Sequence, residues 1–368
     1  MEDLDLTSAF GGAYVGRRVF VTGHTGFKGS WLCLWLRSMG AEVAGYALDP
    51  DTNPSHWQAL GLRIALDTRA DLRDREALAA TLGDFQPELV LHLAAQPLVR
   101  RSYQDPANTF ATNVGGLVNL FETVRGCPSV RAMVNITTDK VYEPPSPPCG
   151  YREVDPLGGH DPYSASKACA EIISASYRRC FFRPAGGSRD PLRLATARAG
   201  NVVGGGDWAE DRLVPDLVRA IQAGQPLRLR NPTATRPWQH VLEPLSGYLE
   251  LGRRLLAGED VDQAWNFGPA TRDCLSVREV VDALARHWPE IDVDSAPPPH
   301  PHEAGQLVLD SSAARERLGW MPVWDATAAL ARTATWYRDF LVDGQPNSTQ
   351  DLAQYIADAR TAGLPWAS

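Results

Sequence analysis

A tyrosine and a lysine stand four positions apart in the run YSASK, as Tyr163 and Lys167. On a helix this spacing places both side chains on one face. A lysine ammonium beside a phenol stabilises the phenolate and lowers the pKa of the tyrosine from about 10, so that the tyrosine can remove a hydroxyl proton while hydride leaves the same carbon. Thr138, which ends a predicted strand upstream, supplies a hydroxyl. Taken alone, the pair is also what a surface helix would carry.

Three glycines, Gly23, Gly26 and Gly29, follow the apolar run RRVFVT and lead into the helical pattern KGSWLCLWLRSMG. The first permits a tight turn, the second lets the backbone approach a pyrophosphate, and the third lets the helix pack closely on a sheet. A pyrophosphate would lie at the helix N-terminus, where free N–H groups favour an anion, and Lys28 would add a cation there. The pattern predicts a dinucleotide site, although a turn that merely needs glycine has the same sequence.

Acidic residues end the second predicted strand, in AEVAGYALDPD, at Asp49 and Asp51. A carboxylate at this position accepts hydrogen bonds from the ribose hydroxyls of an adenosine. Two acids there would repel a 2′-phosphate, so we expect NAD rather than NADP. Asp71 and Leu72, after the third predicted strand, are candidates for holding the adenine. The alternative is that these aspartates are ordinary turn residues beside prolines.

Predicted strands and helices alternate along residues 15–200. Helices are expected in REALAATLGDF, NTFATNVGGLVNLFETVRGC and PYSASKACAEIISASYRRCFF, with short apolar strands between them. This alternation predicts an α/β fold with a doubly wound parallel sheet of the Rossmann type and a smaller C-terminal lobe. We expect an NAD-binding domain at 15–200, a mainly substrate-binding lobe at 201–345 with segments returning to the first domain, and a C-terminal tail at 346–368.

Composition excludes several function classes for this chain of 368 residues, whose formal net charge is −8. Acids and bases are interspersed, which argues against a nucleic-acid surface. Six cysteines without metal-like spacing, an acidic start and the lack of a long apolar run predict a reduced, cytoplasmic protein without a membrane segment. His300 and His302 lie in a proline-rich stretch without other ligands, so no metal site is expected.

Longer runs carry a family resemblance that covers nearly all of residues 15–340. TGHTGFKG, HLAAQ, TNVGG, TTDKVY, YSASK and RAGNVVGGGDW resemble the extended short-chain dehydrogenase/reductase family. GHTGFKGSWL, HLAAQPLVRRSY, DPLGGHDPYSASK and RPWQHVLEPL are most similar to its nucleotide-sugar 4,6-dehydratases, and among these to the branch acting on CDP-glucose. The resemblance implies a hydro-lyase of deoxysugar biosynthesis that converts CDP-D-glucose into CDP-4-dehydro-6-deoxy-D-glucose and water, with NAD kept bound.

The resemblance also implies which residues contact the ligands. Those for the cofactor are Gly23, Thr25, Gly26, Phe27, Gly29, Asp49, Asp71, Leu72, Leu93, Ala94, Ala95, Thr112, Tyr163 and Lys167. For the substrate, the resemblance implies that Asn201 contacts the sugar or a phosphate. Arg236 and, second to it, Arg212 suit the diphosphate because a guanidinium fits phosphate oxygens bidentately. Arg101 and Ser102 are expected near the hexose, although each arginine is also compatible with an ordinary surface position.

Asp139 and Lys140 distinguish a dehydratase from other enzymes that resemble this chain. Loss of water across C5 and C6 needs a base for the C5 proton and an acid for the C6 oxygen. The two residues could fill these roles, with Thr138, Tyr163 and Lys167 completing the catalytic set. Many dehydratases carry glutamate where this chain has Lys140, and a lysine can take the C5 proton only if burial or a nearby cation lowers its pKa. A solvated turn pair is the alternative.

Two other functions stay open from the sequence. An NAD-dependent nucleotide-sugar epimerase would use the same scaffold to invert C4 without losing water. A catalytically silent NAD-sensing module would bind the cofactor alone, but it has no need of Thr138, Tyr163 and Lys167. Relatives commonly pair through two long helices, and the segments NTFATNVGGLVNLFETV and SASKACAEIISASYRR therefore predict a homodimer or homotetramer.

Overall fold

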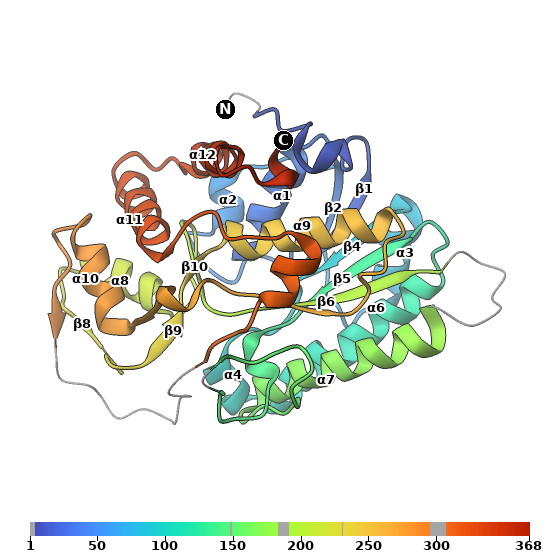
Figure 1. Ribbon diagram of the computed structural model, residues 1–368, viewed down its shortest axis with the longest axis horizontal. Coiled ribbons are helices and arrows are strands. Elements are labelled where there is room, and N and C mark those ends of the chain that lie inside the picture. Colours follow the sequence, from blue (N-terminus) through green and yellow to red (C-terminus); the bar gives the residue numbers. More distant parts are fainter. Residues whose placement is uncertain (1–3, 148, 183–190, 230, 295–306) are drawn as a thin grey trace.

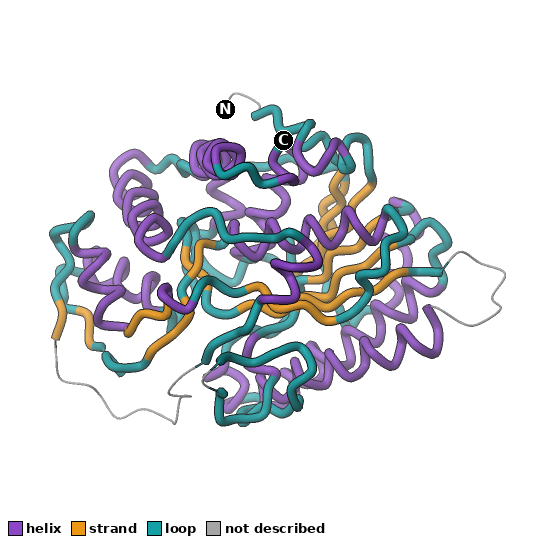
Figure 2. Tube along the Cα trace, in the orientation of Figure 1, coloured by secondary structure: helices purple, strands orange, loops and turns teal. Residues whose placement is uncertain are grey.

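Seven parallel strands form the central sheet of the computed structural model, in the spatial order β3-β2-β1-β4-β5-β6-β11 (Figures 1 and 2). The strands are β1 (Arg18–Thr22), β2 (Glu42–Ala47), β3 (Leu66–Arg69), β4 (Leu89–His92), β5 (Ala132–Ile136), β6 (Arg193–Ala199) and β11 (Ala264–Phe267). The strand order reverses between β1 and β4, which opens a crevice at the carboxyl ends of the strands. The predicted doubly wound Rossmann-type sheet is thereby confirmed. The structure describes residues 4–147, 149–182, 191–229, 231–294 and 307–368.

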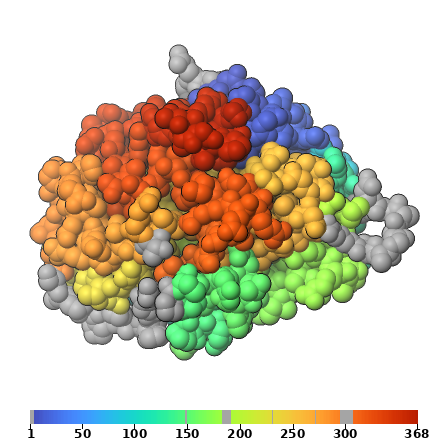
Figure 3. All heavy atoms as spheres, viewed as in Figure 1, coloured from blue at the N-terminus to red at the C-terminus, as the bar shows by residue number. Residues whose placement is uncertain are grey.

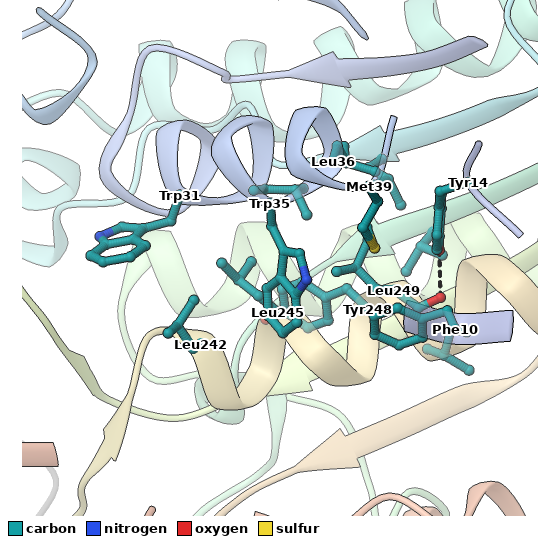
Figure 4. Close-up of a cluster of buried hydrophobic side chains, with 14 of the residues drawn as sticks. Phe10, Tyr14, Trp31, Trp35, Leu36, Met39, Leu242, Leu245, Tyr248 and Leu249 are labelled. Atoms are coloured by element: carbon teal, nitrogen blue, oxygen red, sulfur yellow. Dashed lines mark hydrogen bonds between the residues drawn. The ribbon is translucent and has the colours of Figure 1, made fainter. Parts of the chain in front are cut away.

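One face of the sheet is covered by helices α1, α2, α9 and α12. They span Phe27–Ser38, His56–Leu60, Leu242–Leu256 and Ser348–Thr361. Trp31 and Trp35 are one helical turn apart on α1, and both are fully buried. Figure 4 shows Trp35 between α1 and the facing side of α9, where Leu245 and Tyr248 are also fully buried. The apolar spacing on α1 therefore produces the layer that fixes α9 beneath it.

The opposite face carries a second set of helices (Figure 1). They are α3 (Arg75–Phe85), α6 (Gly116–Arg125) and α7 (Pro162–Tyr177), with the short α4 (Val99–Gln104) and α5 (Pro106–Phe110) near the start of α7. Leu78 and Leu82 of α3 and Leu117 and Phe121 of α6 are fully buried in this second core. Both faces of the sheet are thus covered, which explains why its strands are short apolar runs.

The smaller lobe consists of short strand pairs and helices. β7 (Val202–Val203) pairs with β10 (Gln239–His240), β8 (Leu227–Arg228) with β13 (Val293–Asp294), and β9 (Thr235–Pro237) with β12 (Cys274–Ser276). α8 (Leu213–Gln222), α10 (Val277–Ala285) and α11 (Ala326–Asp343) pack around a third core. Helix α9 and strand β11 return to the Rossmann-type domain. Short 3₁₀ or π turns lie at Ala9–Gly12, Ala111–Gly115, Asp139–Val141, Arg178–Phe182, Thr271–Asp273, Ala314–Leu318 and Pro365–Ala367.

The C-terminal segment is part of the core. The sequence analysis expects a tail at 346–368, but α12 forms there, and Leu352, Tyr355 and Ile356 are buried with Trp366 in the cluster that contains α1. Apolar residues three and four positions apart give α12 one apolar face, and that face is stable only when it is buried. In Figure 3 this dark red segment forms a closed surface with the blue N-terminal residues.

The sequence analysis expects neither a membrane segment nor a metal site, and the described residues can be searched for both. No helix in the described part of the chain is long and apolar enough to cross a membrane. The same residues contain no cluster of three or more histidine, cysteine, aspartate or glutamate side chains suited to a metal ion. His300 and His302 lie outside the described residues.

Leu352→Ala should destabilise the ligand-free protein by about 2–5 kcal/mol, because it deletes a fully buried side chain and leaves a cavity. The measurement is chemical denaturation followed by tryptophan fluorescence. Val342→Ala is the control, since that side chain on α11 is 78% exposed and its loss should cost less than about 0.5 kcal/mol. Equal effects of the two substitutions would show that α12 is not packed in the core.

Candidate active site

The glycine turn between β1 and α1 is shaped by two close backbone approaches. Gly23 has a φ of +75°, and a Cβ atom there would lie 2.7 Å from the backbone nitrogen of Ala94. At Gly29 a Cβ would lie 2.1 Å from the carbonyl oxygen of Gly23. Gly26 is the N-cap residue of α1, so the unpaired N–H groups of the first helical turn are next to it. This cradle of backbone without side chains fits the pyrophosphate of a dinucleotide.

The strand end predicted to hold the adenosine ribose carries a basic residue as well as acids. Asp49 has a side chain that is 85% exposed, and its carboxylate lies 3.5 Å from the guanidinium of Arg69. Arg69 also forms two hydrogen bonds with Asp67. The sequence analysis missed Arg69, because only the pairing of β2 with β3 brings it to this edge. With two carboxylates around one guanidinium, the edge remains acidic on balance, which supports the preference for NAD.

The other predicted cofactor contacts lie on surrounding turns. The Thr25 hydroxyl donates a hydrogen bond to the Leu48 carbonyl. Asp71 pairs with Arg73, and Leu72 is buried against α6. The remaining residues of this set are half-buried: Phe27, Leu93, Ala94, Ala95 and Thr112.

Tyr163 and Lys167 lie in the first two turns of α7. Asp161 caps this helix by accepting the N–H of Ser164, and Pro162 occupies its first position. The Lys167 amine donates to the carbonyl of Ile136 at 3.1 Å, which ties α7 to the end of β5. Burial lowers the pKa of Lys167 to about 8. The predicted pair therefore reaches the carboxyl edge of the sheet.

The ionisation of Tyr163 departs from expectation. Burial raises the pKa of its phenol to about 12, whereas the sequence analysis predicts a lowered value. A hydrogen bond with Thr138 and the charge of Arg212 lower this pKa, but the loss of hydration around the phenolate outweighs them. Formation of the phenolate therefore depends on additional positive charge in the site.

Thr138, Asp139 and Lys140 lie just beyond the end of β5, after Thr137. The Thr138 hydroxyl donates to one carboxylate oxygen of Asp139 at 3.0 Å, and the Lys140 amine lies 3.6 Å from the same oxygen. The second oxygen of Asp139 is buried without a hydrogen-bond partner among the described residues. The Asp139 side chain is only 1% exposed, so this is not a solvated turn pair. The second oxygen is available to accept a hydrogen bond from a ligand.

A buried ion pair supports this edge of the sheet from behind. Arg198 of β6 and Glu171 of α7 lie 2.9 Å apart, and each side chain is 3% exposed. Glu171 also accepts a hydrogen bond from Thr137, and Arg198 donates to the hydroxyl of Tyr142. Glu171 lies one turn beyond Lys167 and opposes the effect of burial on the pKa of this lysine. The network joins β5, β6 and α7 at the level of the candidate catalytic residues.

A cavity of about 930 Å³ lies between the sheet edge and the smaller lobe. Sites for small ligands commonly measure about 300–1,000 Å³. All of the predicted catalytic residues except Lys167, and three of the five predicted substrate residues, line it: Thr138, Asp139, Lys140, Tyr163, Asn201, Arg212 and Arg236. Arg212 is held by Asp207 at 2.9 Å. The cavity thus joins an acid–base edge to a cationic wall.

Arg101 and Ser102, which were expected near the hexose, do not line this cavity. Arg101 forms an ion pair with Asp51 at 2.8 Å, and the fully buried Ser102 donates to a backbone carbonyl of its own helix. The residues of α4 that line the cavity are Val99, Arg100 and Tyr103, and Arg100 pairs with Asp211 of the smaller lobe. Each step along a helix turns the side chain by about 100°, so a prediction that is one residue off selects another direction.

Lys28 also departs from its predicted position. It was expected beside the pyrophosphate, but it lines the cavity, with its amine 3.5 Å from the hydroxyl of Tyr248. The first turn of α1 therefore contributes a side chain to the cavity as well as a backbone cradle.

Comparison with known proteins identifies the scaffold. Residues 19–266 match the NAD dependent epimerase/dehydratase family. The chain belongs to this family. It is 48% identical over 333 residues to a CDP-glucose 4,6-dehydratase of Salmonella typhimurium, which covers 89% of this chain and 92% of that relative.

Solved structures show the same fold. The UDP-glucose 4-epimerase of Thermus thermophilus, in complex with NAD, is 27% identical with a TM-score of 0.74, over 87% of this chain and 99% of the relative. The dTDP-glucose 4,6-dehydratase of Streptomyces venezuelae, also with NAD bound, is 25% identical with a TM-score of 0.71, over 88% and 97%. The predicted fold, family and NAD dependence are confirmed, while the roles of individual site residues stay predictions.

Gly29→Ala should weaken NAD binding at least tenfold, because the added Cβ overlaps the Gly23 carbonyl oxygen and displaces α1 from the turn, a strain of about 1–3 kcal/mol. The measurements are the NAD(H) content of the purified protein and a titration with added NAD. Gly83→Ala on α3 is the control, since no atom lies within 4 Å of its Cβ position, and it should keep normal NAD binding. Normal NAD content in Gly29→Ala would contradict the assigned cradle.

Proposed function

We propose that the chain is a CDP-glucose 4,6-dehydratase, a hydro-lyase of deoxysugar biosynthesis that converts CDP-D-glucose into CDP-4-dehydro-6-deoxy-D-glucose and water. The observation that carries the proposal is that Tyr163 meets the pair Asp139–Lys140 in one cavity. Epimerisation at C4 needs no second acid–base pair, whereas removal of water does. The 48% identity to a CDP-glucose 4,6-dehydratase over most of both chains supports this reaction and this substrate.

The cationic wall suits the diphosphate of a nucleotide sugar. Arg236 is 8% exposed and lines the cavity, and Arg212 is oriented by Asp207. A guanidinium can bind two phosphate oxygens at once. With the diphosphate on the smaller lobe, the hexose extends toward Tyr163 and Asp139 at the sheet edge. The arginines thereby align C4 to C6 with the acid–base groups.

Oxidation at C4 depends on Tyr163. Its phenolate removes the proton of the C4 hydroxyl, and the Thr138 hydroxyl donates a hydrogen bond to the C4 oxygen. NAD, when held at the glycine turn, would supply the acceptor for the hydride from C4 and the donor of hydride to C6. The ketone at C4 acidifies the C5 proton, which prepares the elimination.

Elimination of water depends on Asp139 and Lys140. One member of the pair removes the C5 proton, and the other protonates the C6 oxygen as it leaves. The buried second oxygen of Asp139 provides the acceptor or donor position for the C6 hydroxyl. After hydride reaches C6, a proton returns to C5 and the product retains the ketone at C4.

Asp139→Asn and Lys140→Ala should slow loss of water by about 10²–10⁴-fold, the usual contribution of general acid–base groups, while oxidation at C4 continues. Both variants should accumulate reduced cofactor on the enzyme, seen by its absorbance, or release a 4-keto sugar that still has its C6 oxygen. Wild type with CDP-glucose in heavy water should release a product that has lost water and carries deuterium at C5.

Tyr163→Phe is the matched control, because it should block the first hydride transfer and accumulate no reduced cofactor. A product of unchanged mass with inverted configuration at C4 would contradict the dehydratase function and support the epimerase function. Absence of turnover with a panel of nucleotide sugars, despite bound NAD, would favour the sensing module.

We also propose that the protein is a homodimer that pairs through the helices around α7, and that it acts in the cytoplasm. Ile172 on α7 and Phe110 on α5 are 57% and 37% exposed, and Phe181 beyond α7 is 45% exposed. Large apolar side chains gathered on one surface are typical of subunit contacts. All six cysteines are free thiols, which suits a reducing compartment.

Ile172→Asp should convert the dimer to a monomer, since it places a charge at the centre of the proposed contact. Sedimentation velocity across a range of protein concentrations provides the measurement. Val154→Asp is the control, because that side chain is 82% exposed in a loop outside this helix face and the change should leave the mass unaltered. A dimer that persists in Ile172→Asp would exclude this surface as the interface.

A further inference from the structure

Lysine is confined to three positions in this chain. They are Lys28, Lys140 and Lys167, whereas the other 33 of the 36 basic residues are arginines. Lys28 and Lys140 line the cavity, and Lys167 lies one helical turn behind Tyr163. The predicted acid–base set includes Lys140 and Lys167, and Lys28 is the one that it leaves out.

The two basic side chains differ in one property that matters here. An arginine keeps its charge at every accessible pH, whereas a lysine amine can lose its proton when it is removed from water. A chain that uses arginine for almost every positive charge retains lysine where an amine does something that a guanidinium cannot. The distribution therefore marks Lys28 as a candidate for proton exchange.

The surroundings of Lys28 point the same way. None of the ion pairs among the described residues includes it, since Asp139 pairs with Lys140 and Asp207 with Arg212. Its amine donates a hydrogen bond to the fully buried Tyr248 hydroxyl at 3.5 Å and lies 5.9 Å from the centre of that ring. Figure 4 shows Tyr248 on the side of α9 that faces α1.

Charged groups from several elements act on this amine. Arg212 and Lys167 disfavour its positive charge, Asp139 and Asp207 favour it, and Tyr248 is its hydrogen-bond partner. Burial is the largest effect and lowers the pKa of Lys28 to about 7. The amine is thus poised to hold or release a proton at neutral pH, within the cavity where Tyr163 must ionise.

We propose that Lys28 accepts the proton released when the Tyr163 phenol ionises. The proposal rests on the proposed function, since it assigns a further residue to the same reaction. The phenol loses its O–H proton, the neutral amine gains one N–H bond, and the net charge of the cavity does not change. Lys28 and Tyr163 line the same cavity, and the Tyr248 hydroxyl that contacts the Lys28 amine is close enough to Tyr163 for their charges to interact.

The products of this transfer stabilise each other. A phenolate and an ammonium attract strongly in a cavity that is shielded from water. Lys28 thereby supplies the additional positive charge that the raised pKa of Tyr163 requires.

The small number of lysines makes the protonation of each one measurable. Reductive methylation with isotope-labelled formaldehyde, followed by NMR at a series of pH values, gives signals for three lysines and the chain terminus. The Lys28 signal, assigned by its absence in Lys28→Arg, should titrate near pH 7 in the ligand-free protein. Titration near the ordinary lysine value of 10.5 would overturn the proposal.

Catalysis provides the second test. Lys28→Met should move the pH at which Tyr163 ionises upward by about one unit or more, whereas the fixed charge of Lys28→Arg should not raise it; both are measured from phenolate absorbance with Tyr163→Phe as the reference. Hydride transfer at neutral pH, followed by cofactor absorbance after mixing with CDP-glucose, should fall about tenfold or more in both variants. Normal hydride transfer in Lys28→Arg would show that a fixed charge suffices and would overturn the acceptor role.

Arg37→Met on the last turn of α1 is the matched control, because it removes one exposed positive charge from the same helix. It should leave the Tyr163 titration and turnover unchanged. Thermal melting and NAD content report whether each Lys28 variant is folded. If wild type failed to dehydrate CDP-glucose, the proposed function would fall, whereas the NMR titration would still decide whether Lys28 exchanges a proton at neutral pH.

Discussion

A close backbone approach lies at the start of α1, and much of the site depends on it. Gly29 lies so near the Gly23 carbonyl that no side chain fits between them. This contact seats the N-terminus of α1 against the carboxyl end of β1, where its free N–H groups face a pyrophosphate. The same seating directs Lys28 into the cavity and brings Trp35 onto α9. One steric constraint therefore positions the cofactor cradle, an acid–base side chain and the helix that carries Tyr248.

The second constraint is the cost of burying charge. Tyr163 and Lys167 are buried and Lys28 is half-buried, and each has a pKa shifted toward its neutral form. Glu171 and Arg198 avoid that shift toward neutrality by pairing with each other and by accepting or donating further hydrogen bonds. This ion-paired network is structural, whereas the less completely paired groups in front of it can exchange protons. Whether a charged group at this edge has a structural or a chemical role thus depends on how completely its charge is compensated by neighbouring groups.

The family uses one scaffold for reactions that begin alike. In the proposed function, oxidation at C4 depends on Tyr163, Lys167 and the bound dinucleotide, and an epimerase would use the same set. The pair Asp139–Lys140 lies beside them without disturbing the hydride-transfer geometry, because it follows β5 in a turn of its own. A new reaction step is therefore added at the end of one strand, while the sheet and both helical layers stay the same.

Local pattern determined most of the Rossmann-type domain. The alternation of apolar strands with helices, the glycine turn and the four-residue spacing of Tyr163 and Lys167 are set by neighbours along the chain, so they can be read before folding. α12 could not be recognised as core in this way, because its apolar face is buried only when the folded chain brings α1 against it.

Side-chain direction at the site was decided by tertiary structure. Arg100 rather than Arg101 lines the cavity because of the way α4 is seated, and Arg69 reaches Asp49 only through the pairing of adjacent strands. The predicted lowering of the Tyr163 pKa was wrong, because the spacing of residues along the sequence does not show how far a side chain is removed from water. The sequence by itself determined which acid–base groups are present, whereas burial and the charges brought from other elements decided which way they point and how readily they ionise.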